Sequence, residues 1–276
     1  MVTRDLLKLR ILLSFRVGAQ ESCTVTGIAR SLREEKQKVS RMMIEMEKEG
    51  VIDRSNTRAP VLTEKGERLS REFAERIRIA QNHLIYEGVD LESAKHDAYI
   101  WALYCSDGLL NLVRDNDACY RAKHELRGLK SFDGGELCKK LDDGCYQFPF
   151  IIYREQVKDG DNISMANEGF AHPCTLYVDR GMGVIQLLIQ PMNQKSAFNG
   201  KILRGRVDKL EYFDSGRFIG AEFINDVVSF PADALTFVNM PTATGNILHG
   251  SICVKMRCSC GIAHMPESTA IFTMLI

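Results

Sequence analysis

Long apolar runs are missing from this 276-residue sequence. Its longest ones, such as Ile11–Leu13 and Val184–Ile189, are far shorter than the roughly 20 residues that a helix needs to cross a bilayer. The first residues, MVTRDLLKLRILLSF, include the acidic Asp5 and no small-residue cleavage site. This stretch predicts a first helix rather than a signal peptide. We therefore expect a cytoplasmic protein with no membrane partner.

Common enzyme signatures and a net charge are missing as well. The chain contains no GxSxG, P-loop or HExxH motif, so the sequence predicts that it is not an enzyme. Its 36 Lys and Arg residues balance 36 Asp and Glu residues. The balance is uneven along the chain, because residues 1–80 carry 17 basic against 12 acidic side chains, a local excess of +5. This bias favours a polyanion contact at the N-terminal third.

The N-terminal third has the pattern of a small helical domain followed by a hairpin. Apolar spacing predicts helices over residues 4–18, 27–32 and 36–49, and the third helix carries an apolar stripe of Val39, Met42, Met43 and Met46. Two short strands follow at 51–54 and 58–62, and Thr63 caps a further helix. This order predicts a winged helix-turn-helix.

A helix of this kind fits the major groove of DNA, where its N-terminal side chains reach base edges. The candidate DNA-binding residues lie on the third helix and beside the wing tip: Lys36, Gln37, Lys38, Ser40, Arg41, Arg54 and Arg58. The alternative is that the winged domain mediates protein contacts and that these polar side chains are only solvated.

Residues 1–113 resemble the metal-dependent repressors typified by the manganese transport regulator and the diphtheria toxin repressor. The resemblance rests on TVTGIARSL, KVSRMMIEMEKEGVI, VLTEKGERLSREF and the turn Gly88-Val89-Asp90. It implies a dimeric repressor that binds palindromic operators. The family's metal ligands do not carry over, because the matching positions are Lys8, Ile11, Ile77, Tyr99, Ala102 and Leu103. None of these suits a hard divalent ion; His83, His96 and Asp97 are the alternative ligands nearby.

The rest of the chain divides into a helical and a β-rich part. Residues 92–126 predict one or two helices whose broad apolar face favours a homodimer interface, the alternative being packing within the chain. Beyond residue 134, short β-rich runs alternate with turn signals, and about eight strands are expected. We therefore predict an α+β multidomain chain. Residues 1–70 bind operator DNA, 71–126 dimerise, and 127–276 form a β-rich regulatory or effector domain.

The nine cysteines are expected to be thiols, and some of them are candidate metal ligands. One group lies near the C-terminus: Cys253, Cys258, Cys260 and His264. Thiolate and imidazole ligands suit a transition metal such as zinc. The other interpretation is that these are buried or idle thiols. The function predicted overall is a DNA-binding transcription regulator, and the alternative is a metal- or ligand-binding sensor whose winged helix binds protein.

Overall fold

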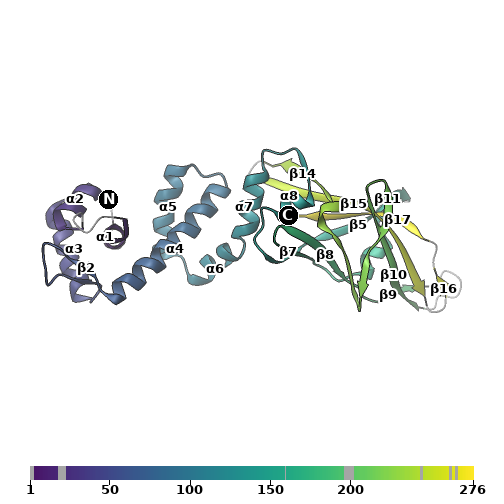
Figure 1. Ribbon diagram of the computed structural model, residues 1–276, viewed down its shortest axis with the longest axis horizontal. Coiled ribbons are helices and arrows are strands. Elements are labelled where there is room, and N and C mark those ends of the chain that lie inside the picture. Colours follow the sequence, from purple (N-terminus) through teal and green to yellow (C-terminus); the bar gives the residue numbers. More distant parts are fainter. Residues whose placement is uncertain are drawn as a thin grey trace. The chain divides into compact units, whose positions relative to one another are not determined.

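The computed structural model describes residues 3–17, 23–158, 160–195, 202–242, 245–260, 263–264 and 267–276. The chain forms two compact units, Met1–Asp117 and Ala118–Ile276, which are treated separately below (Figure 1). The first unit is helical apart from one small hairpin, and the second is built mainly from strands. The fold is therefore mixed, with helices and strands segregated along the chain as an α+β chain requires.

The first unit contains the elements expected from the sequence, in the expected order. They are α1 (Arg4–Val17), α2 (Val25–Leu32), α3 (Lys36–Lys48), the antiparallel strands β1 (Ile52–Asp53) and β2 (Val61–Leu62), α4 (Glu64–Tyr86), α5 (Leu91–Tyr104) and α6 (Asp107–Asp115). Side-chain caps fix where the helices begin. The Thr24 hydroxyl accepts from the backbone N–H of Gly27, and the Thr63 hydroxyl accepts from that of Gly66.

Two hydrophobic cores hold this unit together, and α4 contributes to both. The larger core joins α1, α2 and α3, with Ile11, Val39 and Met43 fully buried, and Leu69 and Phe73 of α4 pack against it. The smaller core gathers Ala80, Ala98 and Leu110, with Ile77 and Trp101 at its edge. A single long helix thus connects the N-terminal helices to the α5–α6 pair.

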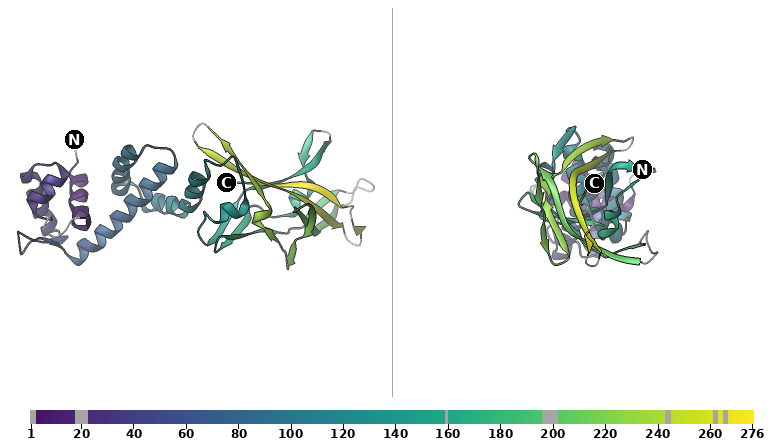
Figure 2. Two further views of the ribbon diagram at one scale, coloured as in Figure 1. Left: turned by 45° about the horizontal axis from the view of Figure 1, so that its top comes forward. Right: turned by 90° about the vertical axis from the view of Figure 1, so that its right-hand side faces the viewer.

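The second unit is built from two antiparallel sheets that share one core (Figure 2). Its short helices are α7 (Asp117–Leu126) and α8 (Gly134–Cys138). In the described residues the larger sheet contains β3 (Ser131–Asp133), β5 (Phe150–Lys158), β6 (Asp161–Ile163), β9 (Met192–Lys195), β10 (Ile202–Asp214), β11 (Arg217–Gly220), β14 (Thr236–Pro241), β15 (Asn246–Cys260), β16 (Ala263–His264) and β17 (Ser268–Leu275). The smaller contains β4 (Gly144–Phe148), β7 (Cys174–Asp179), β8 (Met182–Leu188), β12 (Glu222–Ile224) and β13 (Val227–Pro231).

The observed elements differ from the expected ones in three places. The segment 92–126 forms three helices rather than one or two, since Ser106 caps α6 and a new helix begins at Asp117. The last of them, α7, buries Ala122 and Leu126 in the core of the second unit. The division after Asp117 therefore precedes the expected boundary at 126, and α4 runs across the one expected at 70.

The third difference lies in the β-rich part, where one short β-rich run is divided between the two sheets. Residues 146–153 belong to two strands, β4 in the smaller sheet and β5 in the larger one, separated at Pro149. Proline has no backbone N–H to donate to a ladder, so a strand readily ends there. Among the described residues, no helix is both long enough and apolar enough to cross a membrane.

Candidate nucleic-acid interface

One face of helix α3 is buried in the core, and the opposite face is exposed. Val39, Met42, Met43 and Met46 repeat at helical spacing, and all four are buried against α1 and α2. The opposite face carries Gln37, Arg41, Ile44 and Lys48, all of them exposed. Their spacing of four, three and four residues places them in one row along the helix. We refer to these four residues as the α3 stripe.

The α3 stripe combines the side-chain types that read base edges. Arginine pairs with guanine, a side-chain amide with adenine, and an apolar side chain with the methyl group of thymine. The Nε atom of Arg41 lies 3.5 Å from the carbonyl oxygen of Gln37. Ile44, which is 41% exposed, is absent from the residues predicted from sequence. An isoleucine on the polar side of an amphipathic helix was the signal that would have found it.

Three of the predicted contact residues are paired within the chain or partly buried. Lys38 forms an ion pair with Glu34 at 2.9 Å, and Ser40 is half-buried beside the core residue Val39. The side chain of Arg54 is only 11% exposed and lies 3.6 Å from a Glu47 carboxylate oxygen. Arg54 was expected at an exposed wing tip. The structure instead places its guanidinium against α3, because β1 follows shortly after the end of that helix in the chain.

The loop between β1 and β2 is ordered by its own short polar side chains. Asp53 Oδ1 accepts from the backbone N–H of Ser55 at 2.8 Å and from its hydroxyl at 2.6 Å. These hydrogen bonds lower the pKa of Asp53. Asn56 Oδ1 accepts from the backbone N–H of Arg58 at 3.0 Å, and the Arg58 side chain is exposed. Side-chain-to-backbone bonds of this type stabilise turns, so this loop presents Arg58 on a preformed scaffold.

The C-terminal end of α3 is anchored to two other helices. From α1, Arg4 pairs with Glu45 and Lys8 pairs with Glu49. From α4, Lys65 Nζ donates to the carbonyl oxygen of Glu49 at 2.8 Å. These contacts fix the direction of α3 from the end opposite to Lys36 and Gln37. A preorganised helix loses less conformational entropy on binding.

The positions that match the metal ligands of the repressor family serve structural roles here. Ile11 lies in the larger core, Ala102 is fully buried, and Lys8 is paired with Glu49. His83 packs its ring against Trp101 at a centroid distance of 5.8 Å. In the part of the chain that the structure describes, no three His, Cys, Asp or Glu side chains gather in a way that could hold a metal ion.

The proposed C-terminal metal ligands are spread over a β-sheet. Cys253 and Cys258 both lie on β15, five residues apart, which corresponds to about 17 Å along a strand. Cys258 packs against the core, whereas Cys253 pairs with the exposed Ile271 on the outer face. Opposite faces and this separation prevent the two thiols from binding one ion. The four-residue cluster expected from sequence is therefore not a single site.

The side chains of Cys260 and His264 lie outside the described part of the chain. For Cys253, burial and the nearby Glu155 carboxylate raise the pKa of the thiol. A raised pKa favours the protonated thiol, which is the weaker nucleophile and metal ligand.

Comparison with known proteins gives structural similarities only. No protein-family model and no curated protein matches the chain. Among solved structures, the heme-bound NEAT5 domain of the B. anthracis hemophore IsdX2 is 17% identical, with a TM-score of 0.32 over 48% of this chain and 96% of that one. The manganese regulator SloR is 15% identical, with a TM-score of 0.34 over 83% of this chain and 97% of that one.

A third similar structure is a manganese-dependent transcriptional repressor in complex with manganese. It is 15% identical, with a TM-score of 0.36 over 73% of this chain and 92% of that one. Two of the three similar proteins are thus regulators and the third is a heme-binding domain. At TM-scores this low, the similarities assign neither a fold nor an activity to this chain.

Proposed function

We propose that the chain is a transcription regulator whose residues 4–63 form a winged helix that binds double-stranded DNA. The observation that carries this proposal is the α3 stripe. A helix buried along one side presents glutamine, arginine, isoleucine and lysine in one exposed row on the other. The order of helices, hairpin and following helix is the order of a winged helix and supports the same conclusion.

In this proposal, α3 enters the major groove and the hairpin loop lies over the backbone. Gln37 and Arg41 make hydrogen bonds to base edges, and Ile44 contacts a thymine methyl group. Lys36, Lys48 and Arg58 are exposed cations that contact phosphates. Each neutralised phosphate releases counterions, so affinity falls as salt rises.

We further propose that the regulator acts as a homodimer through α6. Leu109 and Leu112 lie three residues apart on this helix, and they are 41% and 60% exposed. Neighbouring apolar side chains on one helix face suit a self-complementary interface, and a two-fold dimer would bind paired half-sites. The double variant Leu109→Glu/Leu112→Glu should therefore be monomeric in light scattering at concentrations where the parent chain is dimeric. A parent chain that is itself monomeric would contradict this interface.

The second unit is proposed to be the sensing or effector domain. Its own closed core makes it structurally separate from the DNA-binding elements. A second candidate function remains, in which the winged helix binds a protein partner. Ile44 favours it, since an exposed apolar side chain in the middle of a polar row also suits a protein contact. The two functions differ in salt dependence, because only DNA binding releases condensed counterions.

The decisive experiment selects duplexes from a random pool with the full chain and then measures affinity by fluorescence anisotropy over a salt series. Arg41→Ala should cost about 1–3 kcal/mol and relax the preference at one base pair. Arg217→Ala, an exposed arginine on β11 in the second unit, is the matched control and should change nothing. No enriched duplex, or equal affinity for Arg41→Ala and the parent chain, would overturn the assignment.

A further inference from the structure

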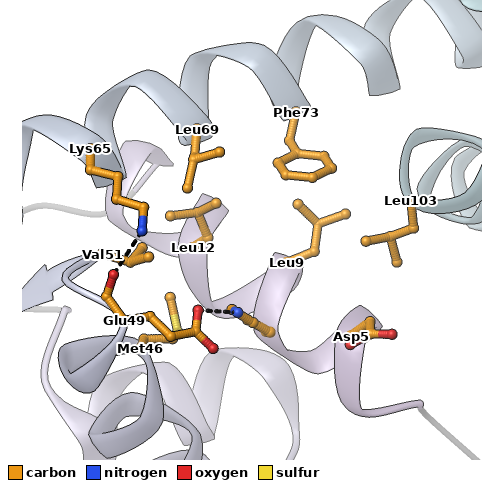
Figure 3. A pocket seen from close by; sticks show the side chains of 11 residues that line it. Asp5, Leu9, Leu12, Met46, Glu49, Val51, Lys65, Leu69, Phe73 and Leu103 are labelled. Carbon is orange, nitrogen blue, oxygen red and sulfur yellow. Dashed lines mark hydrogen bonds and ion pairs between the residues drawn. The ribbon is translucent and has the colours of Figure 1, made fainter. Parts of the chain in front are cut away.

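A cavity of about 360 Å³ opens within the first unit, between α1, α4 and the end of α3 (Figure 3). Its volume lies within the range of about 300–1,000 Å³ that is usual for small-molecule sites. Helix α4 contributes Lys65, Leu69 and Phe73, spaced by four residues, so all three point into the space from one side. This cavity is distinct from the exposed face of α3 described above.

The body of the cavity is apolar. Leu9 and Leu12 of α1 face Leu69 and Phe73 of α4, and Leu103 of α5 closes the end beside Phe73. Wall side chains of this kind favour an aliphatic or aromatic ligand, because burying apolar surface is stabilising by about 25 cal/mol per Å². These wall side chains provide no hydrogen bonds, so the polar residues at the two ends of the cavity have to orient the ligand.

One end of the cavity carries an excess positive charge. Lys8, Glu49 and Lys65 meet there, which gives two cations against one anion, or +1. Glu49 uses its carboxylate for Lys8, whereas Lys65 donates only to the Glu49 carbonyl oxygen at 2.8 Å. No carboxylate among the described residues lies within ion-pair distance of Lys65. An ammonium group has three donors, so Lys65 retains donors for a further acceptor.

The opposite end carries the second acidic residue of the lining, Asp5. Asp5 lies beside Leu103, away from Lys65, and its carboxylate accepts from the Tyr104 hydroxyl at 3.4 Å. The charge along the cavity is therefore polarised, positive near Lys65 and negative near Asp5. A ligand with one anionic head and an apolar tail matches this arrangement when its head lies at Lys65.

We propose that the cavity binds a small amphipathic carboxylate, with the carboxylate at Lys65 and the apolar chain between α1 and α4. The site also touches the end of α3 through Met46 and Glu49. Binding there favours one spacing of α1 and α4 and thereby changes the affinity of α3 for DNA. This second step rests on the proposed function. The change in DNA affinity can be no larger than the difference in the ligand's binding free energy between the two conformations.

Calorimetric titration of the full chain with octanoate tests the site without any DNA. We expect one octanoate per chain, with n-octanol and octylamine binding at least about tenfold more weakly, as loss of a charge-assisted hydrogen bond implies. Lys65→Gln should weaken octanoate by about the same factor. Leu103→Trp fills the cavity and should abolish binding. Lys130→Gln and Leu129→Trp, at exposed positions in the second unit, are the matched controls.

A charge reversal at Lys65 distinguishes loss of the site from a folding defect, because an unfolded variant would bind neither ligand. Lys65→Glu should reverse the preference, so that octylamine binds more tightly than octanoate. Octanoate that fails to bind, or that binds Leu103→Trp as it binds the parent chain, would overturn the site. Anisotropy with a selected duplex then tests the coupling: octanoate should shift DNA affinity for the parent chain and not for Leu103→Trp. Octanoate binding with no shift would overturn the coupling, and absence of a selected duplex would instead count against the proposed function.

Discussion

Two cysteine side chains in the second unit are completely buried. Burial raises the pKa of the Cys138 thiol to about 11, helped by the carboxylates of Asp233 and Asp133. Burial raises the pKa of Cys174 to about 12, and its Sγ donates to the carbonyl oxygen of Phe148 at 3.3 Å. Both thiols therefore stay protonated in the folded chain at a pH where an exposed cysteine has ionised.

These thiols predict a loss of stability in alkaline solution. Below the ordinary thiol pKa of 9.0, folded and unfolded chains bind the same thiol protons, and the contribution is fully present. Above it, only the unfolded chain releases them, so the free energy of unfolding falls until the pH passes the folded pKa values. We expect a loss of about 1 kcal/mol per thiol between about pH 9 and pH 10 in urea titrations.

The control for this prediction is the variant Cys138→Ala/Cys174→Ala. It should be less stable at neutral pH because it leaves two small cavities, but its stability should change less between the two alkaline values. An identical pH dependence in parent chain and variant would show that other groups cause the loss.

At the same scale, the sequence predicts which side chains of α3 are exposed better than it predicts which side chains of the wing are exposed. The buried stripe of α3 follows directly from helical periodicity, so the exposed side follows too. Arg54 and Arg58, however, appear equivalent in sequence, four residues apart on either side of a turn. Their difference arises from packing, since Glu47 and the end of α3 cover Arg54 and nothing covers Arg58. Local patterns do not encode that tertiary contact.

At the scale of elements, the start of α4 depends on a close approach to Val51, the residue just before β1. A Cβ atom at Gly66 would overlap the carbonyl oxygen of Val51. That oxygen accepts from both the backbone N–H and the hydroxyl of Thr63, each at 3.1 Å. Gly66 therefore allows the first turn of the helix to pack directly against the backbone at the start of β1.

We predict that Gly66→Ala destabilises the chain by about 1–3 kcal/mol through this overlap. Gly108→Ala is the matched control, because it also lies in the first turn of a helix and its Cβ would meet only the Ser106 hydroxyl, at 3.9 Å. It should be neutral or stabilising by up to about 1 kcal/mol, given the higher helix propensity of alanine. Urea unfolding followed by circular dichroism measures both. Equal effects of the two substitutions would contradict the steric explanation.

Elements of the first unit were predicted more accurately than those of the second for a physical reason. Caps such as Thr63 and a 3.6-residue period are local signals, and they located α1–α4 to within a few residues. The strands of the second unit are assigned by pairing with distant partners. Residues 227–231 form β13 between β12 and β8, and nothing in this short run alone indicates these partners. The same non-local pairing assigned β4 and β5 to different sheets.

At the scale of the whole molecule, each hydrophobic core among the described residues lies on one side of the division after Asp117. The core of the second unit begins with Ala122 and contains no residue of α1–α6. The two cores of the first unit lie between Leu7 and Leu110. Separate cores remove the main source of cooperativity between the units.

We therefore expect calorimetry of the full chain to record two unfolding transitions rather than one. Fragments 1–116 and 117–276 should each fold alone and reproduce one transition, since the cut falls between α6 and α7. The fragment traces provide the control. A single transition in the full chain, together with unfolded fragments, would show that the units stabilise each other.

The length of helix α4 has a consequence for the proposed regulator. Its 23 residues form a rod about 34 Å long, with Leu69 and Phe73 fixed in one core and Ile77 and Ala80 in the next. One residue inserted between Phe73 and Ile77 would rotate everything beyond it by about 100°. In the proposed dimer, that rotation would set the two α3 helices at a different azimuth around the operator. In the proposed dimer, the number of residues in α4 would therefore set the rotational offset between the two DNA half-sites.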